Sequence, residues 1–196
     1  MTDAQPREQY YTPPPCTHAL LAHLDMEPTE VLEPCAGDGW ISRVLEEQGH
    51  DVVTGDIDPT VDVDLPGKDF FSAFWDTFHT GQCVITNPPW SDAALFVRRA
   101  LELTPNVAML LRLTFFEPCS DETKPKSYRP DLVKSHRSHL VLPRVSFYRG
   151  KLGTDSVCPA WFIWGFEWLD FPAWDVVTER QYQEFAGQQT LNLEAV

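Results

Sequence analysis

The sequence predicts an α/β fold with a mostly parallel, doubly wound sheet and helices on both of its faces. Short, continuous apolar segments alternate with amphipathic segments of helical spacing, which is typical of parallel strands buried on both faces. Two further apolar segments, late in the chain, are expected to pair antiparallel at one edge of the sheet. The 196 residues contain no linker-like stretch, so we expect a single domain over residues 1–196.

Each element has its own signal in the sequence. The first helix is expected over 13–24, where leucines share one face, and Ser91 is the expected N-cap of a later amphipathic helix. Strands are expected at 31–35, 52–57, 83–86 and 107–111, with helices at 40–48, 72–78 and 91–103. The late strands are expected at 145–147 and 161–164, and residues 181–196 are expected to form a short helix and a tail.

The composition excludes several classes of protein. Hydrophobic residues make up 43% and charged residues 22%, and the 17 prolines and 10 glycines follow no period, which excludes a disordered, collagen-like or solenoid chain. No apolar run reaches the ~20 residues that cross a bilayer, so a cytoplasmic protein without a membrane partner is expected. The five cysteines form no C-x-x-C pair and the six histidines lack ligand spacing, so we expect reduced thiols and no metal.

The charge is distributed unevenly along the chain. The net charge of −14 is unlike that of a simple DNA-binding module, which is usually basic. Residues 121–151, however, contain eight Lys and Arg against three Asp and Glu, whereas the rest of the chain sums to −19. This basic segment is interpreted as an insert that forms a local anion-binding surface, or alternatively as a solvated loop.

Two features follow predicted strands at the edge where a doubly wound sheet binds ligands. Residues 33–39 read Glu-Pro-Cys-Ala-Gly-Asp-Gly, a turn that lets a ligand approach the backbone. Asp56 ends the next strand, where a carboxylate can accept hydrogen bonds from a ribose diol. A nicotinamide fingerprint would need glycine at Ser42, and no phosphate-binding lysine follows, so both of those nucleotide motifs are excluded. A tight turn without a ligand is the alternative.

The third feature is the sequence Asn87-Pro88-Pro89-Trp90, directly after the strand at 83–86. The prolines lack backbone donors, so the Asn87 side chain and the Pro88 carbonyl are expected to point outward as acceptors beside the Trp90 ring. Two acceptors and an aromatic face suit a planar group that carries an NH₂. The alternative is a rigid loop with a core tryptophan.

Thr12 precedes three prolines. If Thr12 capped the first helix, its partners would be Pro14 and Pro15, which have no N–H, so its hydroxyl would be available for a carboxylate ligand. If the helix began after Pro15 with Thr17 as its cap, this argument would not apply.

The Asn-Pro-Pro-Trp sequence and the 33–39 turn together resemble the S-adenosylmethionine-dependent amino-methyltransferases, and most of all the small phage-type DNA adenine-N6 methyltransferases. The resemblance covers about residues 10–166. It implies a Rossmann-like class I methyltransferase sheet, S-adenosylmethionine as cofactor, a Thr-Pro segment that contacts the methionine carboxylate, and a late hairpin from 144 to 163 that holds a flipped base. We expect no separate target-recognition domain, which members of the family often carry after the late hairpin. The residues implied for cofactor binding are Tyr11, Thr12, Glu33, Cys35, Ala36, Gly37, Asp38, Gly39, Asp56, Ile57, Asp69, Phe70 and Asn87.

The same residues separate two methylation chemistries. Methylation of cytosine C5 needs a nucleophilic cysteine in a loop beside the base. Cys83 lies four residues before Asn87, but it belongs to a predicted buried strand and is interpreted as a small hydrophobic residue, so no such cysteine is expected. Direct transfer to an exocyclic amine needs no nucleophile, and Asn87 and the Pro88 carbonyl are expected to accept the amine protons. The expected catalytic residues are Asn87, Pro88, Pro89 and Trp90. The target base would be flipped out or single-stranded. The residues expected to bind DNA are Trp90, Lys124, Lys126, Arg129, Arg144, Phe147 and Arg149.

The expected activity is therefore site-specific methylation of adenine N6 in DNA, as in restriction-modification. The same residues leave three alternatives open. The protein could methylate an RNA base amine, it could methylate a protein glutamine, or it could be a non-catalytic acidic mimic of DNA. A homodimer or a protein partner could supply sequence specificity.

Overall fold

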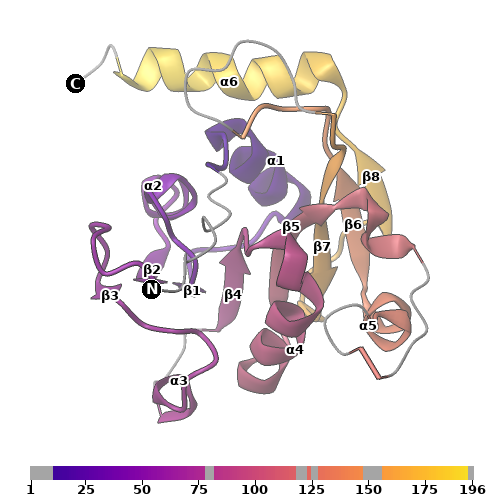
Figure 1. Cartoon of the computed structure of the whole chain (residues 1–196). Coiled ribbons are helices and arrows are strands. Elements are labelled where there is room, and N and C mark those ends of the chain that lie inside the picture. The colour runs from indigo at the N-terminus through magenta and orange to yellow at the C-terminus, as the bar shows by residue number, and fades with distance from the viewer. Residues whose placement is uncertain (1–10, 78–81, 118–122, 125–127, 148–155, 194–196) are drawn as a thin grey trace.

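The computed structural model describes residues 11–77, 82–117, 123–124, 128–147 and 156–193. Eight strands form one sheet in the order β3-β2-β1-β4-β5-β7-β6-β8. The strands are β1 (Glu30–Glu33), β2 (Asp51–Asp56), β3 (Leu65–Pro66), β4 (Cys83–Thr86), β5 (Val107–Arg112), β6 (Ser138–Val141), β7 (Pro159–Trp164) and β8 (Trp174–Val176). Figure 1 shows the sheet running through the middle of the molecule with helices on both sides.

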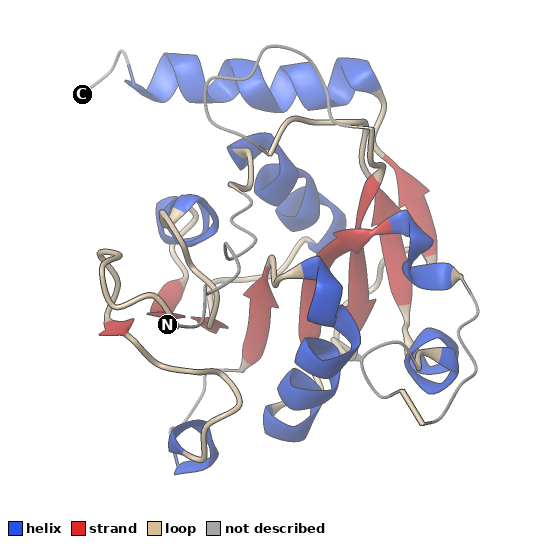
Figure 2. Cartoon of the chain, viewed as in Figure 1, coloured by secondary structure: helices blue, strands red, loops and turns tan. Residues whose placement is uncertain are grey.

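The sheet is parallel from β3 to β5, and β7 is inserted antiparallel between β5 and β6. The strand β8 then pairs parallel with β6 at the edge. The predicted α/β class, with a mostly parallel sheet and antiparallel strands toward one edge, is confirmed (Figure 2). This arrangement places the carboxyl ends of β1, β2 and β4 along one edge of the sheet, where the glycine turn follows β1, Asp56 ends β2 and Asn87 follows β4.

The helices are α1 (Pro14–Leu24), α2 (Trp40–Glu47), α3 (Phe74–Thr77), α4 (Ala93–Leu103), α5 (Pro130–Ser135) and α6 (Glu179–Leu193). Short 3₁₀ turns cover Trp90–Asp92 and Leu113–Phe116. The expected Ser91 cap is wrong, because the 3₁₀ turn continues through Asp92, whose N–H donates to the Pro89 carbonyl, and α4 begins only at Ala93. The helix α1 begins at Pro14 with Pro13 as its N-cap, so neither Thr12 nor Thr17 caps it.

The partner of β7 differs from the prediction. The sequence predicts a strand at 145–147, but β7 pairs with residues 138–141, which carry Ser138 and His139 and therefore lack a continuous apolar signal. Residues 145–147 instead form a segment without regular secondary structure, whose apolar side chains are buried and whose Phe147 carbonyl accepts the Tyr11 N–H. The basic segment is thus no simple loop, because it contains α5 and β6.

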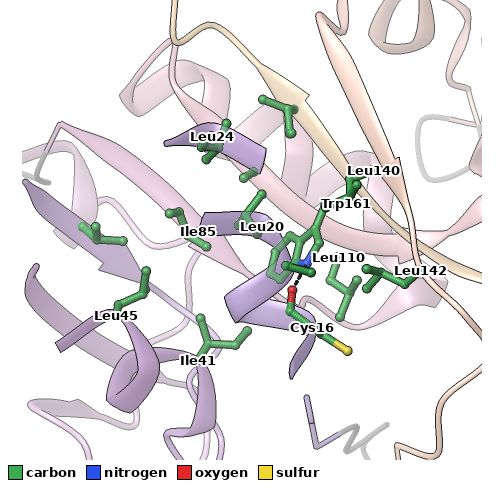
Figure 3. Packing of buried hydrophobic residues seen from close by; sticks show 14 of the residues in the cluster. Cys16, Leu20, Leu24, Ile41, Leu45, Ile85, Leu110, Leu140, Leu142 and Trp161 are labelled. Atoms are coloured by element: carbon green, nitrogen blue, oxygen red, sulfur yellow. Dashed lines mark hydrogen bonds between the residues drawn. The ribbon is translucent and has the colours of Figure 1, made fainter. Parts of the chain in front are cut away.

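Alternating residues of the strands build two cores on the two faces of the sheet. On β5, Ala108 and Leu110 face α1 and α2, whereas Val107, Met109 and Leu111 face α4. On the first face the Trp161 indole N–H donates to the carbonyl of Cys16 at 2.8 Å, which ties α1 to β7 (Figure 3). The helix α6 lies against α1 (Figure 1). These packed faces make the sheet a rigid support for the loops at its carboxyl edge.

Candidate functional site

A cavity of about 1000 Å³ lies at the carboxyl edge of the sheet. Its walls come from the segment before α1, the β1–α2 turn, the loop after β2, residues 68–71 and the loop after β4. Among the residues singled out in the sequence, those that line it are Tyr11, Thr12, Glu33, Cys35, Ala36, Gly37, Asp38, Asp56, Ile57, Asp69, Phe70, Asn87, Pro88 and Pro89. Gly39 and Trp90 are not part of the wall. Segments far apart in the sequence therefore meet at one cavity.

The β1–α2 turn depends on its two glycines. Gly37 and Gly39 have φ angles of 54° and 76°, in the left-handed region that L side chains rarely adopt. The turn closes through the Gly39 N–H, which donates to the Ala36 carbonyl at 2.8 Å, and α2 begins at the next residue. The backbone of residues 36–38 is thereby presented to the cavity.

Asp56 fixes this turn to the end of β2. Its Oδ2 accepts the Gly37 N–H at 2.9 Å, and its Oδ1 accepts the Asp58 N–H at 2.8 Å. Both carboxylate oxygens are thus anchored by backbone, which the sequence did not predict. Each oxygen keeps a second lone pair, so the expected contact with a diol remains chemically open.

The buried side chain of Glu33 has one carboxyl oxygen without a hydrogen-bond partner. It is 1% exposed, lines the cavity, and its Oε2 accepts no hydrogen bond. Burial raises the pKa of Glu33 well above its ordinary range, although hydrogen bonds from Ser42 favour the ionised form. A buried carboxyl oxygen without a partner, facing a cavity, fits a cationic or N–H-donating group of a ligand.

The cavity wall is strongly acidic. The carboxylate residues in it are Glu33, Asp38, Asp56, Asp58, Asp62, Asp69 and Asp92, whereas its cationic residues are Arg43 and Lys68. This imbalance favours a ligand that carries positive charge.

Residues 69–71 supply an acid and two aromatic rings. The Asp69 Oδ1 accepts the Phe71 N–H at 2.9 Å. The Phe70 ring is 3% exposed and stacks on Phe96 at 5.9 Å between centroids, so it serves mainly the core. Phe71, which the sequence pattern did not single out, is 46% exposed and lines the cavity, as does Ile57 at 49%. The second phenylalanine of the pair, together with Ile57, offers the apolar surface that a flat ring needs.

Arg99 on α4 holds this loop in place, and the sequence pattern did not single it out either. Its Nε donates to the Phe70 carbonyl at 3.1 Å and its Nη2 donates to the Ser72 carbonyl at 3.2 Å. The same guanidinium pairs with Asp76 at 2.6 Å and with Glu102 at 3.1 Å. No local pattern could have revealed Arg99, since the loop lies more than twenty residues away in the sequence.

Asn87 is held by hydrogen bonds at both ends of its amide. Its Nδ2 donates to the Thr12 hydroxyl oxygen at 3.0 Å, and its Oδ1 accepts the Trp90 indole N–H at 3.0 Å. Because an indole N–H can only donate, the atom facing Trp90 must be the amide oxygen. The side chain is 8% exposed and lines the cavity, so a buried acceptor of fixed orientation stands at the carboxyl end of β4.

Trp90 and Phe147 pack against each other and are not among the residues that line the cavity. The Trp90 N–H also donates to the Leu110 carbonyl at 3.0 Å, and the ring meets Phe147 edge to face at 5.1 Å. Phe147 is 1% exposed and does not line the cavity. Trp90 is partly exposed, and its expected stacking on a base stays a prediction, whereas Phe147 is buried in the core.

The residues of the basic segment fall into different environments. Lys124 and Arg144 are exposed, whereas Lys126 and Arg149 lie outside the described residues. Arg129 donates to the Glu117 carbonyl at 3.0 Å and lies over the Phe115 ring at 5.6 Å, which fastens this segment to the body of the protein. Lys124, Arg129 and Arg144 do not line the cavity.

Other expected features concern metals, membranes and thiols. Within the described ranges, no group of three or more His, Cys, Asp or Glu residues is arranged to hold a metal ion. None of the described helices is long and apolar enough to cross a membrane. Of the cysteines in the described part of the chain, Cys16, Cys35, Cys83 and Cys158 carry free thiols.

Similarity to known proteins is found at the level of structure, and it agrees with this description of the fold. No model of a known protein family matches the sequence. No curated protein matches it either. Among solved structures, a proposed RNA methyltransferase from Pyrococcus horikoshii aligns with a TM-score of 0.56 at 16% identity, over 81% of this chain and 87% of its own.

Two further solved structures are similar. A proposed class I S-adenosylmethionine-dependent methyltransferase from Listeria monocytogenes aligns with a TM-score of 0.56 at 15% identity, over 84% of this chain and 63% of its own. The modification subunit of a proposed type I restriction enzyme from Vibrio vulnificus aligns with a TM-score of 0.53 at 14% identity, over 88% of this chain and 46% of its own. At these identities the likeness is one of fold, and the fold shared with these proteins is that of the class I methyltransferases.

Proposed function

We propose that this protein is an S-adenosylmethionine-dependent methyltransferase that acts on an exocyclic amine of a nucleic-acid base, with N6 of adenine in DNA as its substrate. The observation that carries the proposal is Asn87, a buried amide of fixed orientation at the edge of an acidic cavity. The solved structures with the same fold include ones named as methyltransferases and as a restriction-modification subunit, which supports the same assignment.

The residues of the cavity fit S-adenosylmethionine. The buried Glu33 Oε2, which has no partner, would receive the ammonium group, and the acidic wall suits a cofactor with two positive centres. Asp56 would bind the ribose diol through its remaining lone pairs, and Ile57 and Phe71 would flank the adenine ring, whose amine would donate to Asp69. The cofactor, when bound, supplies an electrophilic methyl group on its sulfonium.

The chain's own part in the reaction is to orient the amine. Asn87 Oδ1 accepts from Trp90 and has a second lone pair with which to accept an amine N–H. The Pro88 carbonyl is the second acceptor, and together they would turn the nitrogen lone pair toward the cofactor and stabilise the charge that develops on the amine.

A cysteine-dependent mechanism fits this cavity poorly. Cys35 is the cysteine in its wall, and burial together with the negative charge of Asp56 raises the pKa of its thiol well above the ordinary value. A thiol kept protonated is a weak nucleophile. The cavity therefore favours direct transfer to an amine over a covalent adduct at cytosine C5.

Nucleic acid is the substrate class that the surface supports. Lys124 and Arg144 of the basic segment are exposed, and Arg112 is exposed at the end of β5, one strand from Asn87. A duplex would have to extrude the target base to reach Asn87. RNA adenine is the second candidate, because one of the similar structures is named as an RNA methyltransferase.

The test is to incubate the protein with cofactor carrying an isotopically labelled methyl group and with DNA or RNA, and to analyse the nucleosides by mass spectrometry. Labelled N6-methyldeoxyadenosine from DNA is expected, whereas label only in RNA would select the second candidate. Asn87→Ala should lower kcat by ~10²-fold or more and leave cofactor affinity nearly unchanged. Near-normal turnover of Asn87→Ala would contradict the amine mechanism.

A further inference from the structure

We infer that Arg112 binds a phosphate group beside the target nucleotide and so holds the nucleic acid at Asn87. This inference rests on the proposed function and adds to it the residue that anchors the backbone of the substrate. The sequence singles out the cations of residues 121–151, and Arg112 lies outside that segment. Only its place in the folded chain brings it to the site.

Arg112 lies one strand from Asn87. It is the last residue of β5, which pairs parallel with β4, and Asn87 directly follows β4. Its guanidinium carbon lies over the Trp90 ring at 5.0 Å from the centroid, and the Trp90 N–H donates to Asn87 Oδ1 at 3.0 Å. A base that stacks on Trp90 with its amine at Asn87 would bring its own sugar and phosphate close to this guanidinium.

The donors of the Arg112 guanidinium are available to an anion. The side chain is exposed, and among the described residues its guanidinium makes no ion pair and no hydrogen bond. Other arginines of the described ranges bind carboxylates or backbone carbonyls, namely Arg98, Arg99, Arg129, Arg137 and Arg180. Since a guanidinium can bind a phosphate through two parallel hydrogen bonds, Arg112 has both the charge and the donors for this contact.

Charge divides the carboxyl edge of the sheet into two halves. Beyond β1, β2 and β3 the cavity wall is acidic. Beyond β5 and β6 and before β7, the charged residues of the described segments 112–117, 142–147 and 156–159 are Arg112, Arg144 and Glu117. Asn87, after β4, lies between the two halves. The acidic half suits the cationic cofactor, and the half that begins at Arg112 suits the anionic backbone of a nucleic acid.

Arg112 and Arg144 lie at the same edge, on either side of the first residue of β7. Pro159 pairs with Arg112, and its carbonyl accepts the Leu142 N–H at 3.0 Å. Arg144 follows two residues later and is exposed, again without an ion pair among the described residues. Neighbouring strands lie about 4.8 Å apart, so roughly 10 Å separate the ends of β5 and β6. Arg112, nearer to Asn87 in the strand order, would bind the phosphate beside the target nucleotide, and Arg144 a more distant one (Figure 1).

The experiment compares Arg112→Gln with Arg180→Gln. Arg180 is exposed on α6 and pairs with Glu184, so its variant makes the same change of net charge away from β5. We expect Arg112→Gln to raise the Kd for an adenine-containing oligonucleotide about tenfold, measured by fluorescence anisotropy, and to lower the slope of log K against log salt by about one. Arg180→Gln should stay close to wild type, and calorimetry should show unchanged cofactor binding in both variants.

Three outcomes would overturn the inference. An unchanged Kd and salt slope in Arg112→Gln would show that this guanidinium contacts no phosphate. Equal weakening in the two variants would show that only the overall charge matters. A lowered melting temperature or weaker cofactor binding with an unchanged salt slope would show that Arg112 has a structural role instead.

A second measurement locates the phosphate. In an oligonucleotide that the wild type methylates at one adenine, the phosphates next to that adenine are replaced one at a time by uncharged methylphosphonates. One replacement should raise the KM of the wild type about tenfold and leave the KM of Arg112→Gln nearly unchanged, because both changes remove the same contact. If every replacement affects the wild type and Arg112→Gln equally, Arg112 binds no phosphate beside the target and the inference is wrong.

The inference and the proposed function can fail separately. If the wild type binds the oligonucleotide through Arg112 but transfers no methyl group, the proposed function fails and the Arg112 contact stands. If the wild type methylates DNA and Arg112→Gln has the same KM and salt slope, the inference alone fails. If the wild type binds no nucleic acid at low salt, both fail.

Discussion

The side-chain nitrogen of Asn87 donates a hydrogen bond of 3.0 Å to the hydroxyl oxygen of Thr12, across 75 residues of sequence. Thr12 is 4% exposed and precedes α1, whereas Asn87 follows β4. The hydroxyl accepts from Asn87 and keeps its own hydrogen for a second partner, for which a carboxylate of the proposed cofactor is suited. One side chain thus connects the proposed cofactor site to the proposed amine site.

Removing the Thr12 hydroxyl should therefore affect both sites. We expect Thr12→Val, which has nearly the same shape, to lower kcat and to weaken binding of the demethylated cofactor, since a buried amide N–H loses an acceptor worth about 1–3 kcal/mol. Thr12→Ser keeps the hydroxyl and should stay close to wild type. Turnover and calorimetry on both variants measure this, and a Thr12→Val enzyme equal to the serine variant would contradict it.

Glu33 should make stability and cofactor binding depend on pH. Its pKa in the folded protein is raised by burial, so the folded state retains a proton that the unfolded chain releases near its ordinary pKa of about 4.3. Stability should therefore fall as pH rises from that value through the folded pKa. Glu33→Gln should remove this slope in thermal melts, because the amide does not titrate.

Binding of a cationic cofactor should ionise Glu33. An ammonium group beside the buried carboxyl favours its charged form, so binding should release a proton to the solvent. Calorimetry in two buffers of different ionisation enthalpy would detect the proton, and Glu33→Gln should release none. Equal proton release from wild type and Glu33→Gln would show that another group titrates.

Arg99 should support the cofactor site without touching its ligand. Arg99→Ala leaves the Phe70 and Ser72 carbonyls without their charged donor, so we expect a stability loss of roughly 1–3 kcal/mol and weaker cofactor binding. Arg98→Ala is the matched control, because the adjacent Arg98 binds Asp131 and the Tyr128 carbonyl instead. Calorimetry should show weaker cofactor binding for Arg99→Ala and unchanged cofactor binding for Arg98→Ala. Equal cofactor affinity in both variants would show that Arg99 does not support the cofactor site.

The basic segment divides into structural and surface cations, which can be separated by charge reversal. Lys124→Glu and Arg144→Glu should weaken DNA binding, and the slope of log K against log salt should fall by about one for each phosphate that the variant no longer binds. Arg129→Glu should instead lower the melting temperature, because its guanidinium holds the Glu117 carbonyl and covers Phe115.

The control for these reversals is Arg180→Glu on α6, which lies far from α5 (Figure 1). It makes the same change of charge and should leave DNA binding close to wild type. If Arg180→Glu weakens binding as much as Lys124→Glu, only the overall charge matters and the basic segment is a solvated surface.

The sequence by itself determined the alternation of strands and helices, and with it the edge at which a site would form. Apolar runs and glycine turns are local signals, and the carboxyl ends of parallel strands share one edge whatever their order. The glycine turn, Asp56 and Asn87 could thus be assigned to one site from local patterns alone. The strand β6 could not, because Ser138 and His139 interrupt the apolar signal and only pairing with β7 makes it a strand.

The tertiary structure decided how each side chain is used. The sequence pattern predicts that Phe70 lies beside the adenine ring of the cofactor. In the structure Phe70 is buried against Phe96, and Phe71 is the exposed ring of the pair. The same pattern singles out Asn87, but only the folded chain shows that its amide lies between the Thr12 hydroxyl and the Trp90 indole N–H. The periodicity of apolar residues shows which face of a helix or strand is apolar. It carries no information on which distant atom becomes the hydrogen-bond partner of a polar side chain. That depends on strand order and register, which only the folded chain fixes.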